Sequence, residues 1–345
     1  MLTGTSKVVV AARVFPETRR LLEAVGHEVD VNPGPGPWSA GELARRCADA
    51  DALLAFMTDR VDAPLLAACP RLRVVASALK GFDNLDAHAC TAAGVWLTIV
   101  PDLLTAPTAE LAVGLAIGLC RNVCPGDALV RSGSFQGWRP ALYGAGLGGA
   151  TIGVAGMGRV GTAIARRISG FEPHRVLGCD ARPGWPDEAR SLGVEPVSFA
   201  TMLEASDLVF LALPLAPGTR HLVGASALER VRPGCRLVNV GRGGVVDEAA
   251  VARALESGRL AGYAADVFEL EDWAVEDRPR SIHPELLAAR DRTLFTPHLG
   301  SAVAEVRRRI EETAAGNLLA ALAGRTPPNA VNAPSAEALR RRSGV

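Results

Sequence analysis

The sequence lacks a net charge, a long apolar run and paired cysteines, which are features of nucleic-acid-binding, membrane and metal-binding proteins. Its 37 basic and 37 acidic residues leave no net charge, so nothing indicates binding to nucleic acid or to a membrane surface. No run of 18 apolar residues occurs, and no basic stretch precedes an apolar core near the start, which predicts a cytoplasmic protein without membrane spans. The seven cysteines form no Cys-x-x-Cys pair, so we expect reduced, structural thiols and no metal site.

What is present is typical of an α/β enzyme of about two domains: 345 residues, 48% of them hydrophobic and 21% charged. Short apolar runs alternate with helix-like segments in two series, from Lys7 to Ser77 and from Thr151 to Thr296. This alternation predicts two parallel sheets with helices on both faces. Long helices are expected over 107–120 and 301–322, whereas the tail from Thr326 is expected to be partly loose.

One stretch organises the second series. An apolar strand-like run beginning at Thr151 leads into Gly-x-Gly-x-x-Gly, and a helix-like segment follows. In such a turn Gly156 allows the tight bend, Gly158 lets the backbone approach a pyrophosphate, and Gly161 lets helix and strand pack closely. The free N–H groups at the helix start favour phosphate, so the stretch predicts a dinucleotide site.

A carboxylate follows at the spacing that such a site requires. Asp180 ends the next apolar run, 24 residues after Gly156. There it can accept hydrogen bonds from both ribose hydroxyls of NAD. An ordinary turn residue is the alternative, and NADP remains open as a second coenzyme because Arg182 could meet a 2′-phosphate.

Three further groups follow predicted strands. Arg242 lies between glycines, and its planar fork suits an oxyanion. Glu271 and His298 come after later strands, and a carboxylate that holds a histidine fixes the tautomer that proton transfer needs. A surface arginine and a loop histidine are the plainer alternatives.

The glycine turn is followed along the chain by Asp180, Arg242, Asp266, Glu271 and Pro297-His298. This succession of motifs resembles the D-2-hydroxyacid dehydrogenase family, and the resemblance covers nearly the whole chain. The resemblance implies two doubly wound parallel-sheet domains, with a Rossmann NAD-binding domain over 105–299 inserted in a flavodoxin-like substrate domain split between 1–104 and 300–345. It also implies a homodimer. It makes Arg242 the substrate anchor, Glu271 the residue that orients the histidine, and His298 the acid/base.

The resemblance also implies a wider set of coenzyme contacts. These are Thr108, Gly156, Gly158, Arg159, Val160, Gly161, Asp180, Leu213, Pro214, Val240, Asp266, His298 and Ser301.

Stretches around Met57, Lys80-Gly81 and Arg307 resemble one branch, phosphite (phosphonate) dehydrogenase, although 170–198 departs from it. The branch implies NAD-dependent oxidation of phosphite to phosphate, with hydride transfer to NAD. Phosphite carries more charge than a carboxylate, so several cations would suit it. Substrate contacts are then expected from Met57, Lys80, Gly81, Arg242 and Arg307.

Three alternatives stay open. The first is a D-2-hydroxyacid dehydrogenase acting on a small 2-hydroxy or 2-keto acid, and the second is a non-catalytic NAD-sensing scaffold. The third concerns the base, which could be Arg242 in place of His298, although a guanidinium resists deprotonation. The loop over 131–149, with Phe135, Trp138 and Tyr143, either covers its own domain or packs on a partner subunit.

Overall fold

The computed structural model describes residues 5–343 and contains two compact units, which are treated separately. Unit 1 comprises Met1–Leu104, Trp273–Glu276 and Val303–Val345. Unit 2 comprises Thr105–Asp272 and Asp277–Ala302.

Unit 1 is built on a five-stranded parallel sheet in the order β2-β1-β3-β4-β5. Its strands are β1 (Lys7–Val10), β2 (Glu28–Val31), β3 (Ala52–Ala55), β4 (Val74–Ser77) and β5 (Trp96–Thr98). Its helices include α1 (Pro16–Glu23), α2 (Ala40–Cys47), α3 (Ala63–Ala68), α4 (Ala87–Ala92) and α13 (Ala304–Leu322). Every residue of β3 and β4 is buried, and α13 adds Ile310, Ala314 and Leu318 to the same core.

Unit 2 is built on a seven-stranded parallel sheet in the order β12-β11-β10-β9-β6-β7-β8. Its strands are β6 (Thr151–Ala155), β7 (Arg175–Cys179), β8 (Glu195–Pro196), β9 (Leu208–Leu211), β10 (Cys235–Asn239), β11 (Leu260–Ala265) and β12 (Thr293–Phe295). Its helices include α5 (Thr105–Cys120), α6 (Val123–Arg131), α7 (Arg159–Ile168), α8 (Asp187–Ser191), α9 (Phe199–Ala205), α10 (Ala225–Arg230), α11 (Glu248–Glu256) and α12 (Pro284–Ala288).

The sheet of unit 2 is covered on both faces. In β9, Leu208 and Phe210 join one buried cluster, while Val209 and Leu211 join another, as the period of two requires. The first cluster contains residues of α5 and α7, and the second contains residues of α9, α10 and α11. The expected fold class, two doubly wound parallel-sheet α/β domains, is therefore confirmed.

Polar side chains at the N-termini of five helices explain why these helices begin where they do. The N-cap side chains of α2, α3, α4, α9 and α11 each accept a hydrogen bond from the N–H group three residues further on. Each cap satisfies one of the N–H groups that a helix leaves without a partner. The caps are Ser39, Asp62, Asp86, Ser198 and Asp247.

The chain after Thr326 is more ordered than the sequence suggests. It forms α14 (Ala336–Ser343), and Arg342 donates to the carbonyls of Leu72, Leu66 and Cys69 at 2.8, 3.0 and 2.5 Å. The expectation of a partly loose tail was therefore wrong for this part, although Arg340 and Arg341 are exposed. A guanidinium can satisfy several carbonyls at once, and here they lie around the end of α3.

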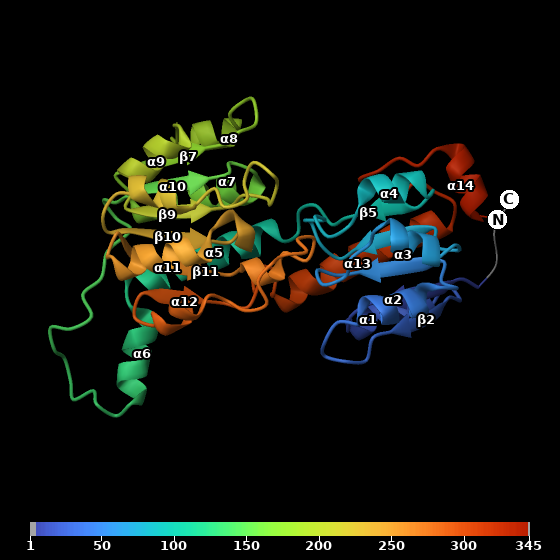
Figure 1. The fold of residues 1–345 in the computed structure, drawn as a ribbon, viewed down its shortest axis with the longest axis horizontal. Coiled ribbons are helices and arrows are strands. Elements are labelled where there is room, and N and C mark those ends of the chain that lie inside the picture. Colours follow the sequence, from blue (N-terminus) through green and yellow to red (C-terminus); the bar gives the residue numbers. More distant parts are fainter. Residues whose placement is uncertain (1–4, 344–345) are drawn as a thin grey trace. The chain divides into compact units, whose positions relative to one another are not determined.

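Helix α6 and the segment after it differ from the rest of unit 2. No residue of α6 is buried, and Figure 1 shows α6 and the following green loop projecting from the unit. Among residues 5–343, no single helix has the length and apolar character to cross a membrane. Helices α5 and α6 pass that test only together, with a bend of 62° between them.

Candidate functional site

The glycine turn connects β6 to α7 at the point where the strand order of the sheet reverses. Strand β6 pairs with β7 on one side and with β9 on the other. Open α/β sheets bind their ligands at such a switch point, beyond the carboxyl ends of the strands. The predicted turn therefore lies where the topology favours a ligand.

Two of the three glycines are required by their surroundings. Gly156 has φ +88°, and a Cβ there would lie 2.6 Å from the carbonyl oxygen of Ala212. A Cβ at Gly161 would overlap the carbonyl of Gly156, so helix and strand could not pack as they do. Gly158 caps α7 without a side chain, which leaves the first N–H groups of the helix for an anion. This cradle fits the pyrophosphate of a dinucleotide.

Asp180 lies directly after β7 and holds the turn from the other side. Its Oδ2 accepts a hydrogen bond from the Met157 N–H group at 2.8 Å. Arg182 donates to the same carboxylate from its backbone N at 2.9 Å, from Nε at 2.9 Å and from Nη2 at 2.6 Å. The Arg182 guanidinium is the main reason why the pKa of Asp180 lies below its usual value.

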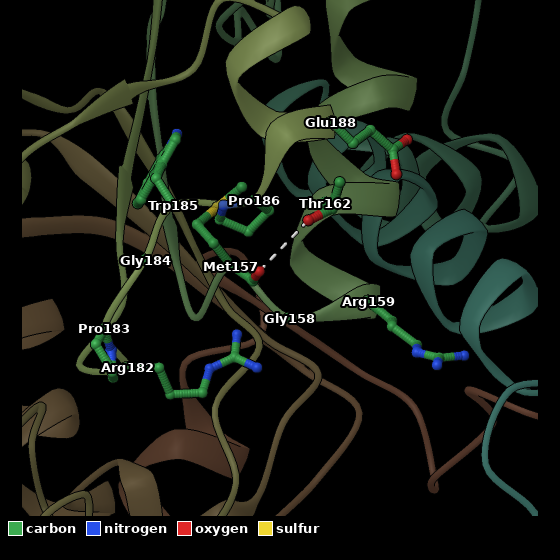
Figure 2. Close-up of a pocket in the computed structure, with 10 residues that line it drawn as sticks. All are labelled: Met157, Gly158, Arg159, Thr162, Arg182, Pro183, Gly184, Trp185, Pro186 and Glu188. Carbon is green, nitrogen blue, oxygen red and sulfur yellow. Dashed lines mark hydrogen bonds between the residues drawn. The ribbon is translucent and has the colours of Figure 1, made fainter.

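A pocket of about 460 Å³ opens beside the turn (Figure 2). Its volume is within the range of about 300–1,000 Å³ that is usual for small-molecule sites. Trp185 supplies an aromatic face, and the Arg182 side chain is directed toward Gly158. The lining residues are Met157, Gly158, Arg159, Thr162, Arg182, Pro183, Gly184, Trp185, Pro186 and Glu188.

The expected histidine–carboxylate pair is present. His298 Nδ1 lies 2.7 Å from Glu271 Oε2, and Glu271 Oε1 accepts a hydrogen bond from the Phe268 N–H group at 3.0 Å. Both side chains are partly exposed, 31% for His298 and 22% for Glu271. With Nδ1 donating to the carboxylate, Nε2 is the ring nitrogen that can exchange a proton.

The loop that carries His298 is held by Asp266. The carboxylate of Asp266 accepts hydrogen bonds from the Thr296 hydroxyl at 2.6 Å and from the N–H groups of Leu299 and Gly300 at 2.6 and 2.8 Å. Burial raises the pKa of Asp266. The sequence assigns Asp266 to the coenzyme, whereas the structure also gives it this bracing role.

Thr108, on α5, contacts the same loop. Its hydroxyl donates to the Gly300 carbonyl at 3.2 Å, and a Cβ on Gly300 would lie 3.1 Å from that hydroxyl. Ser301 is the next residue of the loop and is half-buried. Thr108 and Ser301 are thus placed with His298.

Arg242 follows β10 on a tightly held turn. Asn239 donates from Nδ2 to the Arg242 carbonyl at 3.0 Å and accepts from the Gly241 N–H group at 3.1 Å. Asp272 accepts from the Gly244 N–H group at 2.6 Å. Asn239 and Asp272 hold the turn of the arginine in place. Neither residue belongs to a motif, so the sequence does not point to either.

The remaining predicted residues of unit 2 lie at the same edge of the sheet. Leu213 and Pro214 follow β9, Val240 follows β10, and Arg159 and Val160 open α7. The carboxyl ends of parallel strands share one edge, so these positions flank the glycine turn. Among residues 5–343, no group of three or more His, Cys, Asp or Glu side chains could hold a metal ion.

In unit 1, side chains of Arg307 and Asn84 link the loops that carry the predicted substrate residues. Arg307 Nη1 donates to the Ala78 carbonyl at 3.4 Å, at the start of the loop that carries Lys80 and Gly81. Met57 lies in a second loop, joined to this one by Asn84, which donates to the Met57 carbonyl at 3.2 Å.

The positive charge of Arg307 is partly balanced by one carboxylate. Glu311, one turn further along α13, lies 4.0 Å from the guanidinium. Burial lowers the pKa of Arg307. Arg307 is thus a half-buried cation with one distant carboxylate.

Comparison with known proteins identifies the nature of unit 2. Residues 113–300 match the model of the D-isomer specific 2-hydroxyacid dehydrogenase, NAD binding domain. The coenzyme expected from the glycine turn and Asp180 is therefore confirmed as NAD.

Two curated relatives and one solved structure illustrate the similarity of the whole chain. The glyoxylate reductase of Thermococcus litoralis is 36% identical over 94% of this chain and 96% of its own length. That of Korarchaeum cryptofilum is 38% identical over 94% of this chain and 95% of its own. A solved NADPH-dependent glyoxylate/hydroxypyruvate reductase from Sinorhizobium meliloti superimposes with a TM-score of 0.80, at 28% identity, over 94% of this chain and 97% of its own.

These comparisons correct one expectation. The relatives that match at 36–38% identity are glyoxylate reductases, so the expected oxidation of phosphite, drawn largely from Lys80, is contradicted. Lys80 would be a second cation besides Arg242, and two cations can bind a carboxylate as well as phosphite. The presence of Lys80 therefore does not identify the substrate. The 2-hydroxy or 2-keto acid alternative is the one that the comparisons favour.

Proposed function

Since the chain belongs to the D-isomer specific 2-hydroxyacid dehydrogenase family, we propose that it reduces a small 2-keto acid such as glyoxylate to the 2-hydroxy acid. The coenzyme, when bound, supplies the hydride, and the reverse reaction returns it to NAD. The observation that carries the proposal is the 2.7 Å contact between His298 and Glu271, in the same unit as the NAD-binding turn.

His298 is the acid in this proposal. As the carbonyl carbon is reduced, its oxygen gains negative charge and takes the proton from Nε2, and oxidation reverses the transfer. Glu271 fixes the tautomer and stabilises the imidazolium. Because the pair is fixed by the Phe268 N–H group, little reorganisation is needed at the moment of transfer.

Arg242 anchors the substrate carboxylate in this proposal. A guanidinium binds a carboxylate with two parallel hydrogen bonds, which orients the keto group as well as holding it. The same permanent charge makes Arg242 unsuited to be the base. Within unit 1, we assign Lys80, Gly81, Met57 and Arg307 to the substrate side, and the unit as a whole to substrate binding.

The proposal includes a homodimer in the cytoplasm. The segment formed by α6 and residues 132–143 exposes several large apolar side chains, as an arm for a second copy would. They include Val130, Phe135, Trp138, Leu142 and Tyr143, with Trp138 and Tyr143 each 80% exposed. Light scattering on Trp138→Glu should report a shift toward monomer, and an unchanged mass would remove the arm from the interface.

A substrate panel tests the reaction. Loss of NADH absorbance should be faster with glyoxylate or hydroxypyruvate than with pyruvate. Phosphite with NAD serves as the comparison reaction in the oxidative direction. If phosphite yields NADH with a higher kcat/KM than any 2-keto or 2-hydroxy acid, the proposal fails. If NADH binds but nothing turns over, the chain is a sensing scaffold.

A further inference from the structure

Two short segments of unit 2 that carry site residues lie against each other. The first is the 3-10 helix η2 (Gly243–Val245), which directly follows Arg242, and the second is the 3-10 helix η3 (Glu269–Glu271). A Cβ on Gly243 would overlap the Phe268 carbonyl, so the two backbones are in direct contact. The position of the arginine relative to the glutamate that holds the histidine therefore depends on how these segments are joined.

The side chain of Asp272 joins them. This residue directly follows η3, and its Oδ2 accepts a hydrogen bond from the Gly244 N–H group at 2.6 Å. Asp272 is only 3% exposed, and a Cβ on Gly244 would lie 2.6 Å from the same oxygen, so the carboxylate and the glycine fit closely. A hydrogen bond to a carboxylate is roughly twice as strong as one between neutral groups. Asp272 thus fixes η2 to η3.

The charge of Asp272 has a counterpart in the same unit. Burial and the nearby Arg280 lower the pKa of Arg278, and the negative charge of Asp272 opposes this effect. Arg278 also donates from Nε to the Leu270 carbonyl of η3 at 3.0 Å. The same arginine therefore favours the ionised form of Asp272 and braces the helix that precedes it.

The Arg242 guanidinium follows any movement of its turn. Its Nη1 donates to the Gly241 carbonyl at 3.0 Å, which ties the side chain to its own backbone. Without the Asp272 carboxylate, the buried Gly244 N–H group would lose this acceptor. An unpaired buried N–H group is costly, so the turn would shift to find another acceptor or water. The guanidinium would shift with it.

We propose that Asp272 is a positioning residue that sets the place of Arg242 relative to the pair of Glu271 and His298. A 2-keto acid held by Arg242 then presents its keto oxygen to His298. A displacement of about 1 Å can cost on the order of 10²-fold in rate, even when the substituted residue does not touch the substrate. The inference rests on the proposed function, because it concerns the roles given there to Arg242 and His298.

Steady-state kinetics with glyoxylate at saturating NADH test the proposal. In Asp272→Ala we expect kcat/KM to fall roughly ten- to a hundredfold, mostly through a higher KM, because a displaced anchor binds the carboxylate less well. Asp272→Asn should recover most of the loss, since its amide oxygen can still accept from the Gly244 N–H group. The dissociation constant of NADH, measured by calorimetry, should stay at the wild-type value, because the glycine turn is untouched.

A double variant shows whether Asp272 acts through Arg242. In an Arg242→Ala background, Asp272→Ala should change KM by less than about twofold, because no anchor is left to displace. Asp247→Ala is the matched control. Asp247 lies in the same stretch of chain and caps α11 by accepting from the Ala250 N–H group at 3.0 Å. Its loss should lower stability and leave KM unchanged.

Amide hydrogen exchange gives a readout that needs no turnover. In Asp272→Ala the Gly244 N–H group should exchange about tenfold faster or more. The Phe268 N–H group, which is bound by Glu271, should keep its wild-type rate. Asp272→Glu keeps the charge on a longer side chain, so it should displace the turn and raise KM even if the alanine variant does not fold.

Several results would overturn the proposal. They are losses that add fully to those of Arg242→Ala, equal losses in Asp272→Asn and Asp272→Ala, or a wild-type KM in Asp272→Glu. Unchanged exchange at Gly244, or an equal increase at Phe268, would do the same, because Asp272 would then not hold the turn or would only support the fold. If the wild type reduces no 2-keto acid, the proposed function fails in the substrate panel, and hydrogen exchange still decides whether Asp272 holds the turn.

Discussion

His298 Nδ1 and Glu271 Oε2 lie 2.7 Å apart, although 27 residues separate them in the chain. A second pair of the same kind lies close by in sequence: His221 Nε2 is 2.8 Å from Glu269 Oε2. Both glutamates belong to one 3-10 helix, η3 (Glu269–Glu271). The two histidines differ in the ring nitrogen that is engaged, and only His298 follows a strand at the carboxyl edge of the sheet. The second pair therefore provides a control for the first.

We expect His298→Ala to lower kcat by about 10²–10⁴, the usual contribution of a positioned general acid or base. Binding of NADH should be largely retained, because the glycine turn is untouched and His298 is one of many expected coenzyme contacts. Steady-state kinetics and calorimetry on the same preparation separate the two effects.

His221→Ala is the matched control for His298→Ala. It removes a histidine from an equally short contact with a glutamate, and its side chain is 40% exposed. Turnover in this variant should match the wild type. Equal losses in both variants would mean that a histidine–glutamate contact supports the fold and does not act in catalysis.

Glu271→Gln should have a smaller effect than His298→Ala. The amide oxygen can still accept the hydrogen bond from Nδ1, but the negative charge that stabilises the imidazolium is lost. We expect kcat to fall while KM changes little, because the interaction matters as the proton moves. A variant with wild-type kcat would remove Glu271 from the mechanism.

The sequence predicts the elements well where a periodic apolar pattern or a cap marks them. The helix expected over 107–120 is α5 (Thr105–Cys120), and the one expected over 301–322 is α13 (Ala304–Leu322). Ser39 caps α2 by accepting a hydrogen bond from the Glu42 N–H group at 3.2 Å, and Ser-x-x-Glu is the usual sequence of such a cap. These features depend on neighbours in the sequence, which is why pattern alone finds them.

Features that depend on distant partners are not visible in the sequence. Arg342 binds carbonyls around 270 residues earlier in the chain, so the tail was expected to be loose. The contact between Arg182 and Asp180 depends on the direction of the Arg182 side chain, which the sequence does not show. The sequence indicates Arg182 only as a residue that could meet the 2′-phosphate of NADP. The roles of the individual site residues stay predictions, because proximity does not identify a reaction.

Gly161→Ala should abolish coenzyme binding. The added Cβ would overlap the Gly156 carbonyl, which forces α7 away from the turn at a cost of about 1–3 kcal/mol or more. Gly170→Ala is the control, because a Cβ there has no atom within 4 Å. Calorimetry with NADH and thermal unfolding of both variants test this. Wild-type binding in Gly161→Ala would show that the turn does not hold the pyrophosphate.

Arg242→Ala should raise KM for the 2-keto acid roughly ten- to a hundredfold, as expected for the loss of a charge-assisted contact. Arg242→Lys should recover only part of this, because an ammonium cannot form two parallel hydrogen bonds. Kinetics at saturating NADH give both values. If the lysine variant recovers KM fully, Arg242 acts only through its charge.

The last prediction concerns stability in unit 1. Asp59 is 3% exposed and accepts a hydrogen bond from the Phe56 N–H group at 2.7 Å, in the loop that carries Met57. Burial raises the pKa of Asp59 to about 6, against the partly opposing effect of that hydrogen bond. Between about pH 4 and 6 the native state therefore binds more protons than the unfolded state.

The sign of the effect follows from this difference. A raised pKa gives stability that is fully present below the unfolded value and is lost as the pH rises through the folded value. From pH 4 to about 6 the free energy of unfolding should therefore fall by up to about 3 kcal/mol more in the wild type than in Asp59→Asn, which cannot ionise there. Urea unfolding at several pH values measures the difference, in which all other carboxyl groups cancel. Asp59→Ala, which also loses the acceptor for Phe56, should be less stable than Asp59→Asn by about 1–3 kcal/mol at every pH. Parallel curves for the wild type and Asp59→Asn would mean that Asp59 ionises in the folded protein as it does in the unfolded chain.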